Sequence, residues 1–355
     1  MLDFIREESI WNLLKREQRP IVLYGMGDGA QKILNQCARF QIPVAGIFAS
    51  DEFVRGQSFA GYPVRTLAQT EGIWDDFVIL LCFAAFLPEL MEKIISLSRR
   101  HTLYAPDVPV FGGELFTEDY LAAHEDEIRQ AHALLADEQS RRVLEATVNF
   151  KLSGKISWLT GCETPREEVY TRLLPLCQGE RYLDLGAYDG DTVAEFLHFC
   201  PNPGQMVALE PDPKNFRKLS QYADTLSAPL VSLQAGIWQQ DGTLSFDGRA
   251  GRNSALSPSG RLQVPVRSVD SLAAEYGSFT LIKMDVEGVE REALLGARET
   301  LAAGARLAVS AYHRTGDFFT LPLLLHDLAP DYQIRLRHHP YIPAWETNLY
   351  ATSGR

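Results

Sequence analysis

The chain of 355 residues is longer than one average domain, and its ordinary globular composition lets each half bury a full core, so we expect two domains. A formal net charge of −12 argues against a nucleic-acid footprint, which needs clustered Lys and Arg, and against docking on an anionic membrane. The longest apolar run, residues 77–87, is too short to cross a bilayer, and the N-terminus lacks the order of a signal peptide. Five scattered cysteines without a Cys-x-x-Cys pair fit a reducing compartment, so we predict a soluble cytoplasmic protein.

The first 112 residues alternate between apolar strands and helical patterns. Strands are predicted at residues 21–25, 42–48 and 77–83, and a glycine turn, Gly25–Ala30, follows the first of them. Strands alternating with helices imply a parallel sheet, so residues 1–112 are predicted to form a small Rossmann-like α/β domain.

The Gly25–Ala30 turn has two interpretations. Its G-x-G-x-x-A spacing fits a turn that binds a phosphate at a helix N-terminus, with Asp51 on a ribose. Alternatively, the glycines only let helix and strand pack closely. No second βαβ half follows to complete a dinucleotide site, so the packing interpretation is slightly favoured, and an NAD-linked or sugar-nucleotide role is kept as the alternative.

Residues 113–160 have a helical apolar period and acidic residues near its start at Glu118 and Asp119. We predict two helices that connect the domains.

The second domain, residues 161–355, is predicted from its strand and helix order. Five strands linked by helices and closed by an antiparallel pair fit the plan of a Rossmann-like methyltransferase better than that of a dehydrogenase. The fold class is therefore α/β, with a mostly parallel seven-stranded sheet and an antiparallel last strand. Strands are expected near 182–185, 206–209, 231–234, 280–284, 307–311, 333–338 and 347–351, helices near 168–176, 192–199, 213–222, 290–301 and 318–328, and a hairpin-like insertion at about 236–266.

The first strand of this domain leads into a glycine-rich turn. Gly186 and Gly190 let the chain pass close to a ligand. Asp184 and Asp191 could hold a cationic amine. Glu210 could accept hydrogen bonds from both hydroxyls of a ribose. These acids suit the positive ammonium and sulfonium of S-adenosylmethionine and would repel a pyrophosphate; a simple packing turn is the alternative. The predicted cofactor-binding residues are Asp184, Gly186, Ala187, Tyr188, Gly190, Asp191, Thr192, Glu210, Pro211, Ala235, Gly236 and Asp285.

A second group of charges lies at the end of the strand near 280–284. Lys283, Asp285 and Glu287 alternate and would share one side if strand geometry persisted. They are either functional or an internal Lys–Asp pair beside a helix N-terminal Glu290. Two acids alone are weak support for a cation site, so no metal is predicted.

A third group follows the next strand. His313 titrates near neutrality and could act as a general base, or it could be a hydrogen-bonded rim histidine. The catalytic candidates are therefore Asp285 and His313 as bases, Glu287 to orient the acceptor, and Lys283.

With these groups assembled, the chain resembles the FkbM-like family of S-adenosylmethionine-dependent methyltransferases. The similar motifs are Asp184-Leu-Gly186-Ala-Tyr-Asp-Gly190-Asp-Thr192, Leu209-Glu210-Pro211-Asp212-Pro213, Ile282-Lys283-Met284-Asp285-Val286-Glu287-Gly288-Val289-Glu290, Tyr312-His313-Arg314 and Glu346-Thr347-Asn348-Leu349-Tyr350. The resemblance covers residues 180–355 best. It implies methyl transfer by direct displacement to an oxygen of a sugar or secondary metabolite.

We therefore expect a small-molecule or carbohydrate acceptor, no nucleic acid and no membrane span, and a homo-oligomer is compatible with the sequence. Asn253 and Ser254 could help to cover the site or belong to a surface loop. A non-catalytic scaffold with a methyltransferase fold is the remaining alternative.

Overall fold

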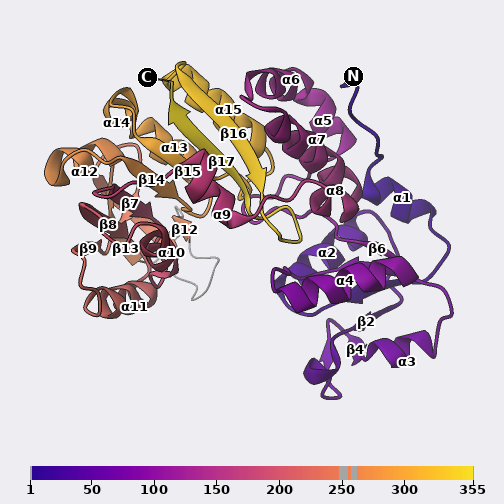
Figure 1. Ribbon diagram of the computed structural model, residues 1–355. Coiled ribbons are helices and arrows are strands. Elements are labelled where there is room, and N and C mark those ends of the chain that lie inside the picture. Colours follow the sequence, from indigo (N-terminus) through magenta and orange to yellow (C-terminus); the bar gives the residue numbers. More distant parts are fainter. Residues whose placement is uncertain (1, 248–254, 257–261, 355) are drawn as a thin grey trace.

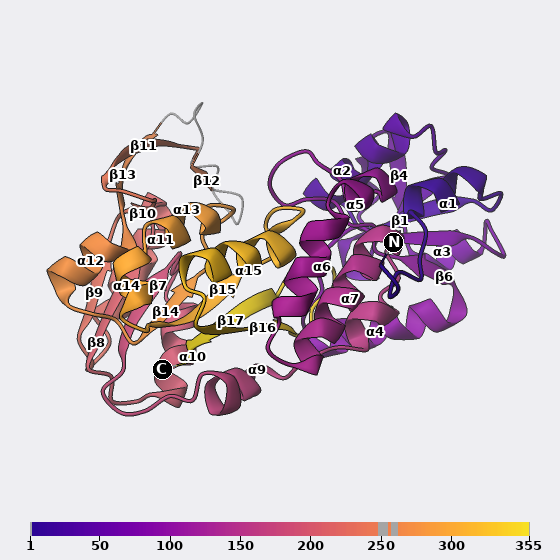
Figure 2. The same ribbon diagram turned by 90° about the horizontal axis from the view of Figure 1, so that it is seen from above.

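The computed structural model describes residues 2–247, 255–256 and 262–354, which form two α/β lobes joined by helices (Figure 1). The N-terminal lobe runs from α1 to β6, and the C-terminal lobe runs from β7 to β17. Seen from above, the connecting helices lie between the two lobes (Figure 2). The expectation for Asn253 and Ser254 concerns residues outside the described part of the chain. No described helix combines the length and the apolar composition needed to cross a bilayer.

The N-terminal lobe contains one sheet, parallel except for its short edge strand β3. In spatial order its strands are β3 (Ser58–Phe59), β4 (Tyr62–Arg65), β2 (Gly46–Phe48), β1 (Ile21–Tyr24), β5 (Val78–Leu81) and β6 (Thr102–Tyr104). Its helices are α1 (Ile10–Arg16), α2 (Asp28–Arg39), the 3-10 turn η1 (Asp51–Phe53), α3 (Leu67–Glu71) and α4 (Pro88–Arg100).

Both faces of this sheet are covered, which explains the unbroken apolar sequence of β1. Leu23 packs in one core with Ile33 of α2. Val22 faces the opposite core, which also contains Phe150 of a connecting helix and Ile342 of the C-terminal lobe. Because one core spans both lobes, the N-terminal sheet is fixed against the rest of the protein.

The connecting segment has four helices where the sequence predicts two. Asp137 begins the third helix by accepting a hydrogen bond from the Ser140 amide at 2.8 Å, and Gly154 ends it at φ 67°. These caps set the two ends of that helix within the longer apolar period. The four are α5 (Glu118–Ala123), α6 (Glu125–Leu134), α7 (Glu138–Ser153) and α8 (Ser157–Thr160).

The C-terminal lobe has the predicted seven-stranded sheet, and the predicted fold class is confirmed. Six of its strands run in the same direction, and β17 is antiparallel to both of its neighbours. In spatial order the strands are β16 (Tyr332–His338), β17 (Thr347–Ser353), β15 (Arg306–Ser310), β14 (Leu281–Met284), β7 (Arg181–Leu185), β8 (Gln205–Leu209) and β9 (Leu230–Leu233).

Two helices of this lobe differ from the prediction. The helix expected over residues 290–301 is interrupted at Gly296, where a Cβ would lie 2.7 Å from the Trp238 carbonyl oxygen. The one expected over 168–176 is a short helix followed by a π-helical turn. The helices are α9 (Arg166–Glu168), η2 (Val169–Leu173), α10 (Asp191–Phe199), α11 (Pro213–Ala223), α12 (Val269–Tyr276), α13 (Glu290–Leu295), α14 (Arg298–Ala302) and α15 (Asp317–Leu328).

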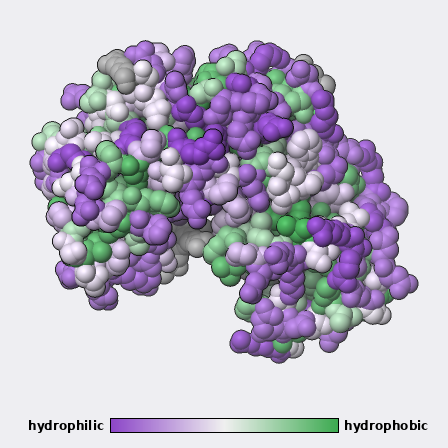
Figure 3. Space-filling model, viewed as in Figure 1, coloured by the Kyte–Doolittle hydropathy of each residue, from purple (hydrophilic) through white to green (hydrophobic). Residues whose placement is uncertain are grey.

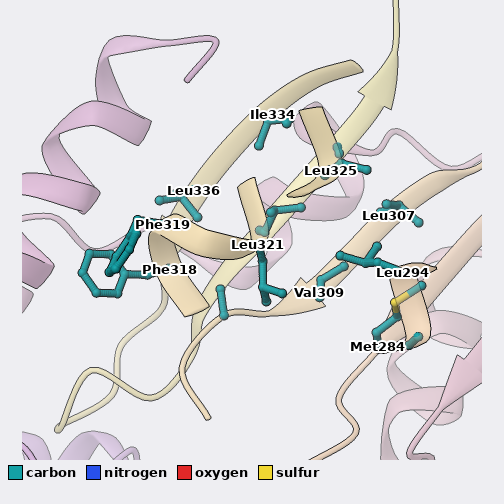
Figure 4. Close-up of a cluster of buried hydrophobic side chains, with 14 of the residues drawn as sticks. Met284, Leu294, Leu307, Val309, Phe318, Phe319, Leu321, Leu325, Ile334 and Leu336 are labelled. Atoms are coloured by element: carbon teal, nitrogen blue, oxygen red, sulfur yellow. The ribbon is translucent and has the colours of Figure 1, made fainter. Parts of the chain in front are cut away.

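Helix α15 covers one face of this sheet with apolar side chains. Leu321 and Leu325 pack toward Val309 of β15 and Leu336 of β16 (Figure 4). This apolar layer packs against β14 and β15, and the predicted catalytic residues follow the ends of these strands. The insertion forms a separate small sheet of β10 (Gly236–Ile237), β13 (Leu262–Arg267), β11 (Gly242–Asp247) and β12 (Ala255–Leu256).

Candidate active site

A cavity of about 850 Å³ lies between the two lobes. Residues that follow the carboxyl ends of parallel strands in both main sheets line it, among them Cys82 after β5, Gly186 after β7 and Asp285 after β14. The space-filling view shows the surface hollowed between the lobes (Figure 3). Ligands of parallel α/β sheets bind at such strand ends, so the cavity is the candidate site.

The turn after β7 is built from residues with positive φ: 80° at Gly186, 47° at Tyr188 and 98° at Gly190. A Cβ on Gly186 would lie 1.9 Å from the Asp285 carbonyl oxygen, and one on Gly190 would lie 2.4 Å from the Tyr222 ring. Glycine is therefore required at both positions. The predicted turn does bring β7 and β14 into contact at the cavity.

Glu210, which follows β8, is hydrogen-bonded to the backbone of this turn. Its two carboxylate oxygens accept hydrogen bonds from the backbone amides of Tyr188, at 3.0 Å, and Asp212, at 2.8 Å. Burial raises the pKa of Glu210 to about 7. Glu210 lies at the edge of the sheet expected for a ribose ligand, although neither it nor Pro211, Ala235 or Gly236 lines the cavity between the lobes.

Asp184 and Lys283 form a buried pair beneath the turn. Asp184 is fully buried, accepts a hydrogen bond from the Thr192 hydroxyl and lies 3.4 Å from the Lys283 ammonium. Lys283 also donates to the Gly186 carbonyl oxygen at 3.1 Å. Asp184 therefore holds neighbouring side chains in place and does not line the cavity, unlike Asp191, Thr192 and Lys283.

The turn after β14 brings three carboxylates to one histidine. His313 Nδ1 lies 2.7 Å from Glu290 Oε1, and His313 Nε2 lies 3.3 Å from Asp285 Oδ1 and 3.6 Å from Glu287 Oε2. Strand geometry ends at Met284, and it is the left-handed backbone of Glu287 that returns its side chain toward His313. The imidazole thus links a buried carboxylate to two that line the cavity.

The charges of this group depend on one another. Burial alone would lower the pKa of His313, but Glu290 and Asp285 raise it to about 10, so the imidazole is charged at neutral pH. Burial raises the pKa of Glu287 to about 8. Burial opposes ionisation of Asp285 as well, yet Lys283 and His313 keep its pKa below the usual value.

Among the described residues, one cluster has the residue types and spacing of a possible metal site. It consists of Asp285, Glu290 and His313, whose potential ligand atoms lie within 4.8 Å of one another. Both ring nitrogens of His313 already face carboxylates on opposite sides of the ring. This geometry fits a hydrogen-bonded relay better than three donors converging on one ion.

Backbone strain is concentrated at the cavity. Of the five non-glycine residues with positive φ in the described chain, Tyr188, Glu287 and Glu346 line it. Such conformations cost about 1–3 kcal/mol each and persist where the surrounding structure enforces them, commonly at ligand sites.

One polar side of the cavity, absent from the predicted site, is called the polar wall: it consists of Arg166 of α9, Glu195 of α10, Glu346 before β17 and Asn348 of β17. Arg166 pairs with Glu195 at 3.2 Å and with Glu346 at 2.5 Å, and Asn348 donates to Glu346 at 3.2 Å. The Oδ1 of Asn348 is buried and has no hydrogen-bond partner within the described residues. The antiparallel direction of β17 explains the omission, because it brings the start of this strand to the edge where the parallel strands end.

With this geometry in view, residues 184–330 match the family model described as the methyltransferase FkbM domain. The match to the FkbM domain thus lies within the C-terminal lobe. The match includes the turn after β7, Glu210 and the histidine with its three carboxylates.

The whole chain shares its fold with a solved structure, the methyltransferase FkbM of Methylobacillus flagellatus KT. The two superpose with a TM-score of 0.72 at 23% identity, over 96% of this chain and 92% of the other. The fold that accompanies the FkbM domain here, including the N-terminal lobe, is thus shared with that protein.

Two curated relatives match part of the chain. The hexuronic acid methyltransferase AglP of Haloferax volcanii is 26% identical over 117 residues, covering 32% of this chain and 49% of AglP. The 2-O-methyltransferase NoeI of Sinorhizobium fredii is 28% identical over 142 residues, covering 34% of this chain and 58% of NoeI. The matched regions thus span about half the length of each relative.

Proposed function

We propose that this protein is an S-adenosylmethionine-dependent O-methyltransferase that acts on a hydroxyl of a carbohydrate. The FkbM domain supports the reaction class, and the names of the two relatives, one acting on a hexuronic acid and one a 2-O-methyltransferase, support an oxygen of a sugar. The observation that carries the proposal is the group Glu290–His313–Glu287 at the cavity beside the turn after β7. Five free thiols agree with a cytoplasmic location.

The residues of the turn suit this cofactor in their chemistry. Glu210 is a carboxylate at the end of the strand next to the turn, where a ribose diol would be accepted. Asp191 and Asp285 provide negative charge in the cavity near a cationic ligand. When bound, S-adenosylmethionine supplies an electrophilic methyl group on a positively charged sulfur.

The protein must remove the proton of the acceptor hydroxyl, and the pKa values favour Glu287 for this step. Lys283 and His313 keep Asp285 ionised and weakly basic, and His313 itself already carries two protons at neutral pH. Glu287 has a pKa of about 8, close to the working pH, which is the condition for efficient general base catalysis. In this mechanism Glu287 takes the proton, and His313, held by Glu290, stabilises the ionised Glu287 carboxylate before the step.

The polar wall orients the acceptor. Asn348 Oδ1 is a buried acceptor for which the described part of the chain offers no hydrogen-bond donor, so a sugar hydroxyl that donates to it would satisfy an otherwise costly group. Together with Glu346 and Arg166 it provides donors and acceptors on one side of the reacting hydroxyl. Much of the rate would come from this alignment.

A thermal-shift panel tests the cofactor. S-adenosylhomocysteine at one hundred times its dissociation constant should stabilise the protein by about 2.7 kcal/mol, whereas NAD and sugar nucleotides should not. If neither S-adenosylmethionine nor S-adenosylhomocysteine raises the unfolding temperature, the proposal is contradicted. Mass spectrometry of mixtures containing S-adenosylmethionine and a library of sugars should then reveal a mass increase of one methyl group on an oxygen.

A further inference from the structure

The glycine turn of the N-terminal lobe opens into the same cavity as the FkbM domain. In the N-terminal sheet, β2 and β4 lie on one side of β1, and β5 and β6 lie on the other. The strand order therefore reverses at β1, and the switch point lies between β1 and β5. Met26, Asp28 and Gly29 from one side of that point, and Cys82 and Phe83 from the other, line the cavity. This is the position at which a parallel α/β sheet binds ligands.

The turn is not arranged for a phosphate. A Cβ on Gly29 would lie 2.2 Å from the Cys82 carbonyl oxygen, so this glycine serves close packing. Asp28 occupies the first position of α2, where an anion would otherwise bind. Lys32 lies 3.2 Å from Asp28 and also donates to the carbonyl oxygens of Pro109, at 3.3 Å, and Val110, at 3.2 Å.

Charge in the rest of the cavity also disfavours an anion. The described lining contains six Asp and Glu residues, against three Lys and Arg residues and the protonated His313. Each of these four cations, Lys32, Arg166, Lys283 and His313, already has a carboxylate within 4.0 Å. An additional negative group would have no uncommitted lysine or arginine among these residues.

The lining changes character from one lobe to the other. On the side of the C-terminal lobe, charged and polar groups stand among aromatic and aliphatic side chains; the polar ones include Arg166, Glu195, Glu287, Glu346 and Asn348. On the side of the N-terminal lobe most of the side chains are apolar and partly accessible, namely those of Met26, Phe83, Ala84, Phe86, Val108 and Val110. Phe86 is 47% exposed and stacks on Tyr341 across the lobe boundary at 5.6 Å.

The lobes are fixed against each other at this boundary. Ala85 and Ile342 exchange two backbone hydrogen bonds, of 2.7 and 2.9 Å, between the loop after β5 and the loop that carries Trp345 and Glu346. The apolar and polar parts of the lining are therefore two ends of one preformed space. The volume of about 850 Å³, which the acceptor shares with the reacting end of the cofactor, is in the range of ligand-binding sites.

We propose that the acceptor is an uncharged amphiphilic glycoside that spans both lobes. Its hydroxylated ring lies at Glu287 and Asn348, and its apolar aglycone, an alkyl or aryl group, lies against Met26, Phe83 and Val108 of the N-terminal lobe and its adjoining loop. This inference rests on the proposed O-methyltransferase function and assigns the N-terminal lobe a role in acceptor selection.

The test measures binding of β-D-glucosides with methyl, butyl, hexyl and octyl aglycones to the full chain saturated with S-adenosylhomocysteine, by calorimetry below micelle-forming concentrations. Affinity should rise with chain length, by up to about fourfold per methylene while the chain stays in the cavity. Met26→Glu should remove this dependence, and the volume-conserving Met26→Leu should keep it. Ala84→Glu, with Ala84→Ser as its control, provides a second pair in case Met26→Glu folds poorly.

Several results would overturn the inference. These are equal affinity for methyl and octyl glucoside, a chain-length dependence that survives in both glutamate variants, or no binding of any glucoside to the protein loaded with S-adenosylhomocysteine. Tighter binding of uridine diphosphate glucose than of octyl glucoside, lost in Lys32→Ala, would instead assign this end to a phosphate. Failure of the protein to bind S-adenosylhomocysteine at all would contradict the proposed methyltransferase function, and not only the assignment of the aglycone.

Discussion

A glycine-rich turn follows the first strand of the main sheet in each lobe, and both turns reach the same cavity. In the N-terminal turn, Gly29 packs on a carbonyl oxygen of the neighbouring strand end, and the adjacent charges, Asp28 and Lys32, are paired with each other near the surface. In the C-terminal turn, Gly186 packs in the same way, but the charges beneath it are buried and connect to the histidine with its three carboxylates.

The residue that follows the next strand distinguishes the two turns most clearly. Asp51 follows β2, is exposed in a 3-10 turn and does not line the cavity. Glu210 follows β8, is 6% exposed and accepts a hydrogen bond from the turn itself. A glycine pattern therefore indicates close packing of strand and helix, and the acid at the neighbouring strand end is the feature that supports a nucleoside site at only one of the two turns.

Replacement of Glu287 tests the C-terminal site most severely. Glu287→Gln keeps the size of the side chain but removes the base, so kcat should fall about 100- to 10,000-fold while the affinity for S-adenosylhomocysteine is retained. The matched change in the N-terminal turn, Asp28→Asn, should leave kcat within a small factor. Equal losses in both variants would remove the distinction between the two turns.

The two lysines beside the turns should differ in their contribution to stability. Lys283→Met leaves Asp184 buried without its partner and should lower the free energy of unfolding by about 3–5 kcal/mol. Lys32→Met breaks a partly exposed pair, for which about 1 kcal/mol or less is expected. Urea unfolding of both variants measures the difference, and similar values would show that burial of the pair at β14 is unimportant.

Alanine at two glycines separates packing from backbone conformation. Gly186→Ala combines a clash at 1.9 Å with a positive φ and should destabilise by about 3 kcal/mol or more. Gly27→Ala has open space around it and a positive φ, so about 1–2 kcal/mol is expected. Thermal unfolding at constant pH provides the readout, and the reverse order would contradict the packing argument.

Cofactor affinity separates the two acids at the strand ends. Loss of a charged hydrogen-bond acceptor in Glu210→Ala should weaken binding of S-adenosylhomocysteine by about 1.5–3 kcal/mol, or roughly 10- to 150-fold. Asp51→Ala should bind it like the unmodified protein. Unchanged affinity in Glu210→Ala would place the ribose elsewhere.

The pH dependence of stability provides a more gradual test. Folding raises the pKa of His313 from 6.5 to about 10, so its contribution is complete below pH 6.5 and is lost as the pH rises through 10. The raised pKa of Glu287 acts in the same direction between pH 4.5 and 8. Unfolding free energies of the unmodified protein should therefore fall more steeply from pH 7 to 10 than those of His313→Gln, and parallel curves would contradict the ion pairs with Glu290 and Asp285.

Much of the C-terminal lobe could be predicted because its signals are local. Apolar runs interrupted by helical periods are sufficient to order β7, β8, β14 and β15, and residues at their carboxyl ends must meet at one edge of a parallel sheet. Lys283, Asp285 and His313 were expected there for that reason, and the structure does bring them together. The number of connecting helices is harder to predict, because a capping residue such as Asp137 begins a new helix while the apolar period of the sequence continues.

The fold class, the resemblance to FkbM methyltransferases and the strand ends that carry the charges can all be predicted from the sequence, since each depends on short-range periodicity or on a contiguous motif. Packing in three dimensions decided which charges are buried, that Glu290 holds His313, and that Asn348 of the antiparallel β17 and Glu346 just before it enter the cavity. It also decided that the N-terminal turn faces the same cavity. These features depend on contacts between residues far apart in the chain, for which no local pattern exists.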